Sequence, residues 1–104
     1  MKQIIDGKIY NTETASKIGE WDNRLGFSDS RHCAEVLYKT RKRAWFVQGR
    51  GGAMTAWSES KGGTTWGGSS IRTLTEEEAL HWCENHNIDT DVIEEHFTIE
   101  EEEA

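Results

Sequence analysis

The chain contains no proline and only two cysteines, Cys33 and Cys83. The cysteines are far apart in unrelated contexts, and no basic, apolar N-terminal segment that would direct secretion precedes them. We therefore expect two reduced thiols in a cytoplasmic protein. No apolar run approaches the roughly 18 residues that a membrane span requires, so no membrane partner is expected.

Lysine and arginine are missing from the C-terminal part of the chain. Residues 75–104 contain twelve acidic residues and no Lys or Arg, whereas residues 1–74 contain twelve basic against seven acidic residues. The formal net charge of −7 therefore combines +5 in the first part with −12 in the second. Such asymmetry is typical of an interaction surface or an acidic tail, and it also fits internal pairing of the two parts.

Only 35% of the 104 residues are hydrophobic, but five Trp, three Phe and two Tyr supply large areas for burial. This length is sufficient for one domain with a modest core. We expect a single α+β domain over residues 1–99, followed by an acidic, disordered tail at 100–104. The tail is expected because its like charges repel and nothing apolar anchors them.

Local patterns predict a hairpin and a helix near the N-terminus. Asp6-Gly7 favours a tight turn with positive φ between two apolar stretches, which is typical of a short β-hairpin. After a possible cap at Asn11 or Thr12, apolar residues recur at helical spacing at Ala15, Ile18 and Trp21. This spacing predicts an N-terminal helix that ends near Asn23.

The middle of the chain favours strands. Residues 33–40 and 44–48 are β-branched and aromatic runs joined by three basic residues, which predicts an antiparallel hairpin at the centre of the sheet. Residues 49–70 hold seven glycines around two tryptophans, which indicates an ordered loop. Residues 71–74 are expected to form a last short strand.

Two short helices are predicted after Leu74. Thr75 and Glu78 have the spacing of a capping box, so a helix should start there and bury an apolar stripe through Trp82 and Cys83. Thr90 or Asp91 is expected to cap a second helix. The predicted architecture is therefore a small antiparallel sheet with an N-terminal helix and two short C-terminal helices.

Four segments of the chain form a recognisable pattern: DGKIYNTETASKIGEW (6–21), LYKTRKRAWFVQGRGG (37–52), WGGSS (66–70) and IRTLTEEEALHWCE (71–84). This pattern resembles a family of small uncharacterised proteins carried by phages, plasmids and other mobile elements of Gram-positive bacteria. The motifs are structural and none encodes chemistry, and Arg43 departs from the pattern by standing where glycine is expected in the turn. The resemblance implies a bacterial host cell, and it places the chain beside small proteins that disable host defences, including CRISPR-Cas inhibitors.

The sequence offers no complete catalytic or metal-binding constellation. His81, Cys83, His86 and His96 are close in sequence, but only Cys83 and His86 have good spacing on a helix, and zinc requires four converging ligands. Neither cysteine lies in a known nucleophile signature, so Cys83 is interpreted as a small buried hydrophobe. We therefore expect a protein that is not an enzyme and binds no metal or other cofactor.

A glycine-rich stretch such as 49–52 can bind a phosphate through its successive backbone amides. It follows a strand but opens no helix, and it lacks the Lys-Ser/Thr of a nucleotide-binding loop. A tight turn is the better interpretation of these residues.

The leading hypothesis is a protein-binding inhibitor or modulator that docks an acidic surface on a basic groove of a host protein, such as a CRISPR-Cas or other defence nuclease complex. Exposed tryptophans would add the apolar contact that charge alone does not provide. The residues assigned to this surface are the acids Glu76, Glu77, Glu84, Asp89, Asp91, Glu94 and Glu95 and the rings Trp57 and Trp66.

The alternative hypothesis is a nucleic-acid-binding accessory or regulatory protein. Basic side chains interleaved with aromatic rings can hold a nucleic-acid backbone while bases stack, although the acidic remainder would repel a duplex. The residues assigned to this alternative are Lys39, Arg41, Lys42, Arg43 and Arg50.

Overall fold

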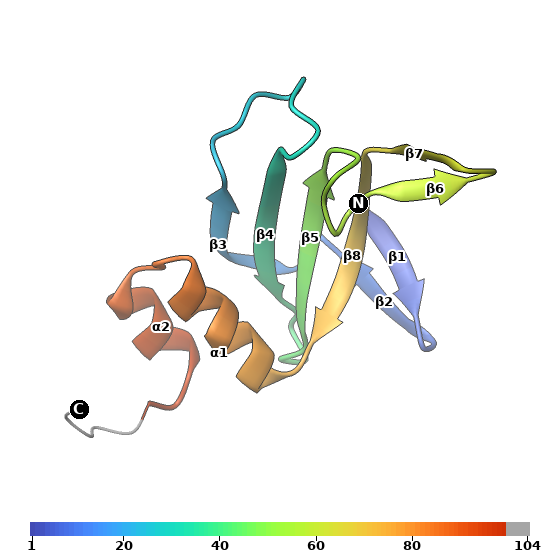
Figure 1. Cartoon of the computed structure of the whole chain (residues 1–104). Helices are drawn as coiled ribbons and strands as arrows, with labels where there is room; N and C mark the ends of the chain where they lie inside the picture. Colours follow the sequence, from blue (N-terminus) through green and yellow to red (C-terminus); the bar gives the residue numbers. More distant parts are fainter. Residues whose placement is uncertain (100–104) are drawn as a thin grey trace.

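The protein has an α+β fold, given by a computed structural model that describes residues 1–99 (Figure 1). The predicted tail at 100–104 lies outside the described residues. In chain order the elements are β1 (Lys2–Ile5), β2 (Lys8–Asn11), β3 (Ser16–Asp22), β4 (Cys33–Lys39), β5 (Trp45–Gly51), β6 (Glu59–Lys61), β7 (Thr64–Trp66), β8 (Gly68–Leu74), α1 (Glu76–Asn85) and α2 (Thr90–His96).

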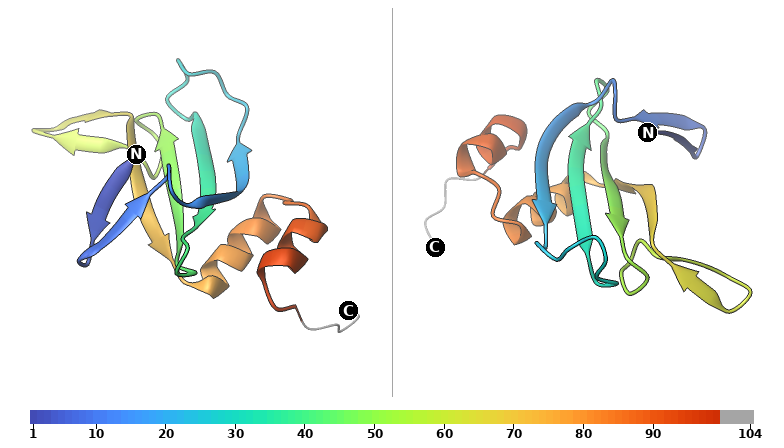
Figure 2. Two further views of the ribbon diagram at one scale, coloured as in Figure 1. Left: turned by 180° about the vertical axis from the view of Figure 1, so that it is seen from behind. Right: turned by 90° about the horizontal axis from the view of Figure 1, so that it is seen from above.

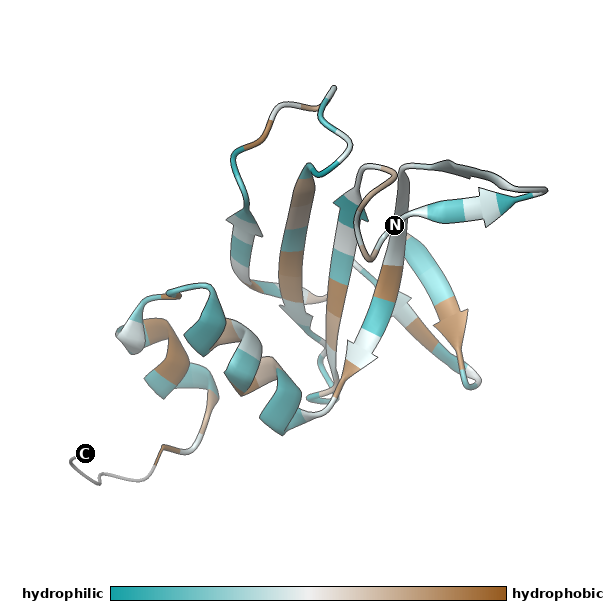
Figure 3. Cartoon of the chain, viewed as in Figure 1, coloured by the Kyte–Doolittle hydropathy of each residue, from teal (hydrophilic) through white to brown (hydrophobic). Residues whose placement is uncertain are grey.

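The centre of the molecule is a four-stranded antiparallel sheet in the order β3-β4-β5-β8, flanked by the two-stranded hairpins β1-β2 and β6-β7. Side chains alternate across β5: Trp45 and Val47 face the cluster that packs under the helices, whereas Phe46 faces the cluster formed with Tyr10 of β2. Figure 3 shows hydrophobic residues along β4 and β5 and also in β1, β8 and α2. The sheet separates a helical layer from the N-terminal hairpin.

The predicted N-terminal helix is wrong, because these residues form β3 instead. Ile18 is an additional residue in a β-bulge, where Lys17 pairs with Tyr38 and Gly19 pairs with Leu37. The bulge breaks the two-residue alternation, so Ile18 and Trp21 pack against the same cluster although they are three residues apart. A bulged strand therefore imitates the spacing of a helix.

Other local predictions are confirmed. Asp6 and Gly7 both have positive φ, 50° and 76°, and close the β1-β2 hairpin. Strands β4 and β5 pair over their whole length as the central hairpin. In α1 the Thr75 hydroxyl accepts from the backbone N–H of Glu78, and the Glu78 carboxylate accepts from the backbone N–H of Thr75, which completes the predicted capping box.

The predicted cap of the second helix is wrong. The cap of α2 is Asp89, rather than Thr90 or Asp91, and its side chain accepts from the backbone N–H of Asp91.

The glycine-rich middle of the chain is more regular than a loop. Strand β5 continues through Gly51, so the tight turn expected at 49–52 is absent, and β8 begins as early as Gly68. Between them the β6-β7 hairpin projects from the body on the side away from the helices (Figure 2). Gly49 is required inside β5 because a Cβ atom there would overlap the indole of Trp57.

Candidate functional site

The seven predicted acids lie on α1, on α2 and at the N-cap of α2, and we call this set the acidic helical surface. All seven side chains are exposed to solvent. Glu76 and Glu77 lie in the first turn of α1, where the helix dipole stabilises negative charge, and Asp89 caps α2. The set is Glu76, Glu77, Glu84, Asp89, Asp91, Glu94 and Glu95.

None of these carboxylates forms an ion pair with a Lys or Arg side chain within residues 1–99. The charged contact made by one of them is from His81 Nε2 to Glu77 Oε1, at 3.9 Å. Glu78 does not belong to this surface, since its carboxylate is held by Thr75. Hydrogen bonds from Thr75 lower the pKa of the Glu78 carboxyl group, and the bond from the backbone N–H has a larger effect than the one from the side chain.

Buried side chains hold both helices against the sheet. Ala79, Trp82 and Cys83 anchor α1 in the core. Phe97, which follows α2, stacks on Trp45 of β5 with ring centroids 4.6 Å apart and planes at 11°. Both helices that carry the acidic helical surface therefore pack against the core, α1 through buried residues and α2 through half-buried ones.

The predicted basic set is split between the two ends of β5. Lys39 and Arg43 lie near the β4-β5 turn and line a groove together with Glu94 and Glu95 of α2. The Lys39 ammonium lies 5.1 Å from the Trp45 ring centroid and 3.5 Å from the carbonyl oxygen of His96. Arg50 lies at the other end of the strand. Opposite charges are therefore neighbours beside α2, although they are separated along the sequence.

Arg41 and Lys42 line a second groove beside the N-terminal hairpin. The groove has a volume of about 650 Å³ and includes Ile9, one of the exposed large hydrophobic residues. Arg41, Lys42 and Arg43 are all exposed, whereas Lys39 is half-buried. The five cations therefore do not form one continuous basic strip.

The two candidate tryptophans differ. Trp66, at the base of the β6-β7 hairpin, is 43% exposed, and its indole N–H donates to Glu59 Oε2 at 3.2 Å. The prediction that Trp57 is exposed is wrong: it is 6% exposed and belongs to the core cluster beneath the helices. Trp57 is buried because it packs on Gly49 and finds a buried acceptor for its N–H group.

That acceptor is Glu35 of β4, which was not recognised in the sequence. The buried carboxylate accepts from Trp57 Nε1 at Oε2 and from Trp82 Nε1 at Oε1, both at 2.8 Å. His86, at the end of α1, places Nε2 3.9 Å from Oε1 and stacks on Trp21 with ring centroids 4.4 Å apart. The one available signal was a charged residue in an otherwise apolar central strand.

Burial lowers the pKa of His86, and the nearby Glu35 carboxylate partly opposes this shift. His86 is therefore disposed to stay neutral beside the carboxylate. Glu35 connects a strand, a loop and a helix, so its role in this arrangement is to fix the core rather than to contact a partner.

Neither cysteine is an activated nucleophile. Cys83 is fully buried, and burial followed by the charge of Glu84 raises its pKa to about 11. Burial and then Glu35 also raise the pKa of Cys33. Both changes disfavour the reactive thiolate. Over the described part of the chain, no group of three or more His, Cys, Asp or Glu side chains is arranged to hold a metal ion.

Searches against family models, characterised proteins and solved structures gave no match to this chain. In the residues that the structure describes, no helix has the length and apolarity needed to cross a membrane. Functional interpretation therefore rests on the geometry and charge described above.

Proposed function

We propose that the protein is a non-enzymatic binding protein that inhibits or modulates a host protein by docking its acidic helical surface on a basic groove. The observation that carries the proposal is the set of seven exposed carboxylates on two helices packed against the sheet, with no ion pair to any Lys or Arg of residues 1–99. Such a surface attracts a basic partner over distance and raises its rate of association.

The most specific version of the proposal is interference with a defence nuclease. The nucleic-acid channel of such an enzyme is lined with Lys and Arg, and carboxylates spaced along two helices would compete there with phosphates. The resemblance to mobile-element proteins supports this context. Trp66 lies on the β6-β7 hairpin, on the side of the molecule away from the helices, so it is not part of the surface that would meet the basic groove.

The test compares two triple variants with equal changes in charge. In the first, Glu84, Glu94 and Glu95 are replaced by Gln, which neutralises the helices; in the control, Glu13, Glu20 and Glu59 are replaced by Gln. Each is assayed for inhibition of DNA cleavage by purified CRISPR-Cas nucleases. The helical variant should lose at least tenfold in inhibitory potency, mainly through slower association and with weaker salt dependence, while the control keeps its potency.

Inhibition that is unchanged in the helical variant would remove the electrostatic basis of the proposal, and a lack of inhibition across the nucleases would remove its defence version. The nucleic-acid alternative gives a different pattern. In that case Arg41→Gln with Lys42→Gln would abolish salt-dependent binding of oligonucleotides, and the helical variant would leave that binding intact.

A further inference from the structure

A shallow pocket of about 350 Å³ lies where three chain segments meet: the loop before β4, the end of β5 and the junction of β7 with β8. In Figure 1 these segments lie at the end of the sheet away from α2. Gly52 allows this closure, since a Cβ atom there would overlap the backbone of Ser30. The pocket is separate from the acidic helical surface and does not depend on the function proposed for it.

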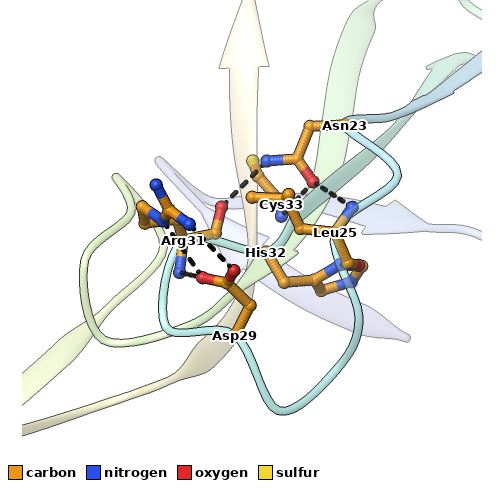
Figure 4. Close-up of polar contacts among 6 residues, drawn as sticks. All are labelled: Asn23, Leu25, Asp29, Arg31, His32 and Cys33. Atoms are coloured by element: carbon orange, nitrogen blue, oxygen red, sulfur yellow. Dashed lines mark hydrogen bonds and ion pairs between the residues drawn. The ribbon is translucent and has the colours of Figure 1, made fainter.

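A buried histidine lines this pocket with one ring nitrogen unsatisfied. His32 is 5% exposed, and its Nδ1 lies 2.6 Å from the carbonyl oxygen of Leu25; Figure 4 shows the ring beside Leu25. Since a carbonyl oxygen only accepts, Nδ1 carries a proton and donates it. Nε2, on the far side of the ring, has no hydrogen-bond partner. Within residues 1–99 it is the one buried side-chain nitrogen or oxygen atom without such a partner.

An arginine without a carboxylate partner shares the pocket. Arg50 is exposed and forms no ion pair within the described chain. The acid in the pocket, Asp29, is already neutralised, because Arg31 donates to it from Nε at 3.2 Å and from Nη2 at 3.1 Å, as Figure 4 shows. The pocket therefore has an excess of positive charge next to an unsatisfied imidazole nitrogen.

A single aromatic ring covers this arrangement. Phe27 is 81% exposed, and its ring centroid lies 4.8 Å from that of His32 and 5.7 Å from the guanidinium carbon of Arg50. So large an exposed apolar ring has little to hold it except these two contacts. An aromatic ring in this position can stack on a planar group attached to a ligand in the pocket.

We propose that this pocket binds a phosphate monoester through Arg50 and His32. The arginine fork matches phosphate oxygens, and Ser28 and Ser30 also line the pocket. The second pKa of a phosphate monoester is about 6, so both of its ionic forms are present near neutral pH. Together they offer a P–OH donor and anionic acceptors. The monoester can therefore satisfy Nε2 in either protonation state of the imidazole, which a carboxylate or sulfate cannot do.

The experiment is a titration of the ¹⁵N-labelled full chain, followed through the His32 ring nitrogens by NMR. The probes are inorganic phosphate, O-phosphoserine and adenosine 5′-monophosphate, with sodium chloride at equal ionic strength as the reference. We expect saturable shifts of the His32 Nε2 resonance with all three phosphates. Tighter binding of the nucleotide would assign the natural ligand to nucleotides, and tighter binding of phosphoserine would assign it to phosphorylated side chains.

Three variants complete the test. Arg50→Gln should weaken phosphate binding at least tenfold, whereas Arg41→Gln, with the same change in charge at the other end of β5, should leave it unchanged. His32→Asn keeps a donor for the Leu25 carbonyl and removes Nε2, so it should also lose binding. If it fails to fold, the His32 resonances in Arg50→Gln still decide the question. Absence of saturable shifts, or equal binding by Arg50→Gln, would overturn the proposal.

Discussion

At the scale of single residues, the core depends on one carboxylate. Glu35 receives hydrogen bonds from the indole groups of Trp57 and Trp82, which come from a loop and from α1. Hydrogen bonds to charged groups contribute more than neutral ones, and each donor left without an acceptor in the interior costs about 1–3 kcal/mol. The contribution of Glu35 to stability therefore lies in satisfying two buried donors at once.

We expect Glu35→Ala to lower the free energy of unfolding by about 3 kcal/mol, because it leaves both indole N–H groups unpaired. Urea denaturation followed by tryptophan fluorescence measures this change. The exposed Glu84→Ala serves as the control and should change stability by less than about 0.5 kcal/mol. A loss below about 1 kcal/mol for Glu35→Ala would show that water or another group replaces the carboxylate.

His86 links stability to pH. Its pKa in the folded protein lies below the ordinary value of 6.5 because burial disfavours the charged ring. Protonation therefore favours the unfolded chain, so this stability is present above about pH 6.5 and is lost as the pH falls below it toward the folded-state pKa. We expect the decline in stability between pH 6.5 and 5, measured by urea denaturation, to be shallower in His86→Gln than in the original chain.

At the scale of elements, the sequence predicted the features that depend on residues close together in the chain. The Asp6-Gly7 turn, the β4-β5 hairpin and the Thr75-Glu78 capping box are encoded within a few residues, and all three are observed. The N-terminal helix was wrong because a bulge in β3 places Ile18 and Trp21 on one face. A bulge is defined by pairing with a strand some twenty residues away, so local periodicity cannot reveal it.

The same limit applies to the candidate sites. The excess of acidic residues on α1 and α2 was visible in the composition, since residues 75–104 contain no Lys or Arg. Burial of Trp57 depends on Glu35 and Gly49, and the pocket at His32 requires three separate segments to meet. Both features need tertiary contacts that a single sequence does not specify.

The backbone of the β4-β5 turn is strained at Arg43. Arg43, which stands where the resembling family pattern leads us to expect glycine, has φ of +65°. A left-handed conformation costs an L-residue about 1–2 kcal/mol, and glycine avoids this cost. Part of the gain is lost because glycine has more conformational freedom in the unfolded chain. Arg43→Gly should therefore raise the free energy of unfolding by about 0.5–1 kcal/mol in chemical denaturation. Arg41→Gly, in the same turn, is the control and should give no gain.

At the scale of the whole molecule, the helices close over the sheet and isolate the Cys83 thiol. Because the side chain is fully buried and its pKa is raised to about 11, a thiol reagent can modify it only after the chain opens. In a Cys33→Ser background, the labelling of Cys83 should accelerate with urea in parallel with global unfolding. Rapid labelling in the absence of denaturant would show that α1 detaches on its own.

The projecting β6-β7 hairpin has a practical consequence. All six of its strand residues are exposed, and a Cβ atom built on Gly62 or Gly63 of its turn would have open space around it. A peptide tag or a fluorophore introduced at this turn would stand clear of both the helices and the His32 pocket. Immobilising the chain through this tip would leave either binding face free, so that a captured ligand reports on the undistorted molecule.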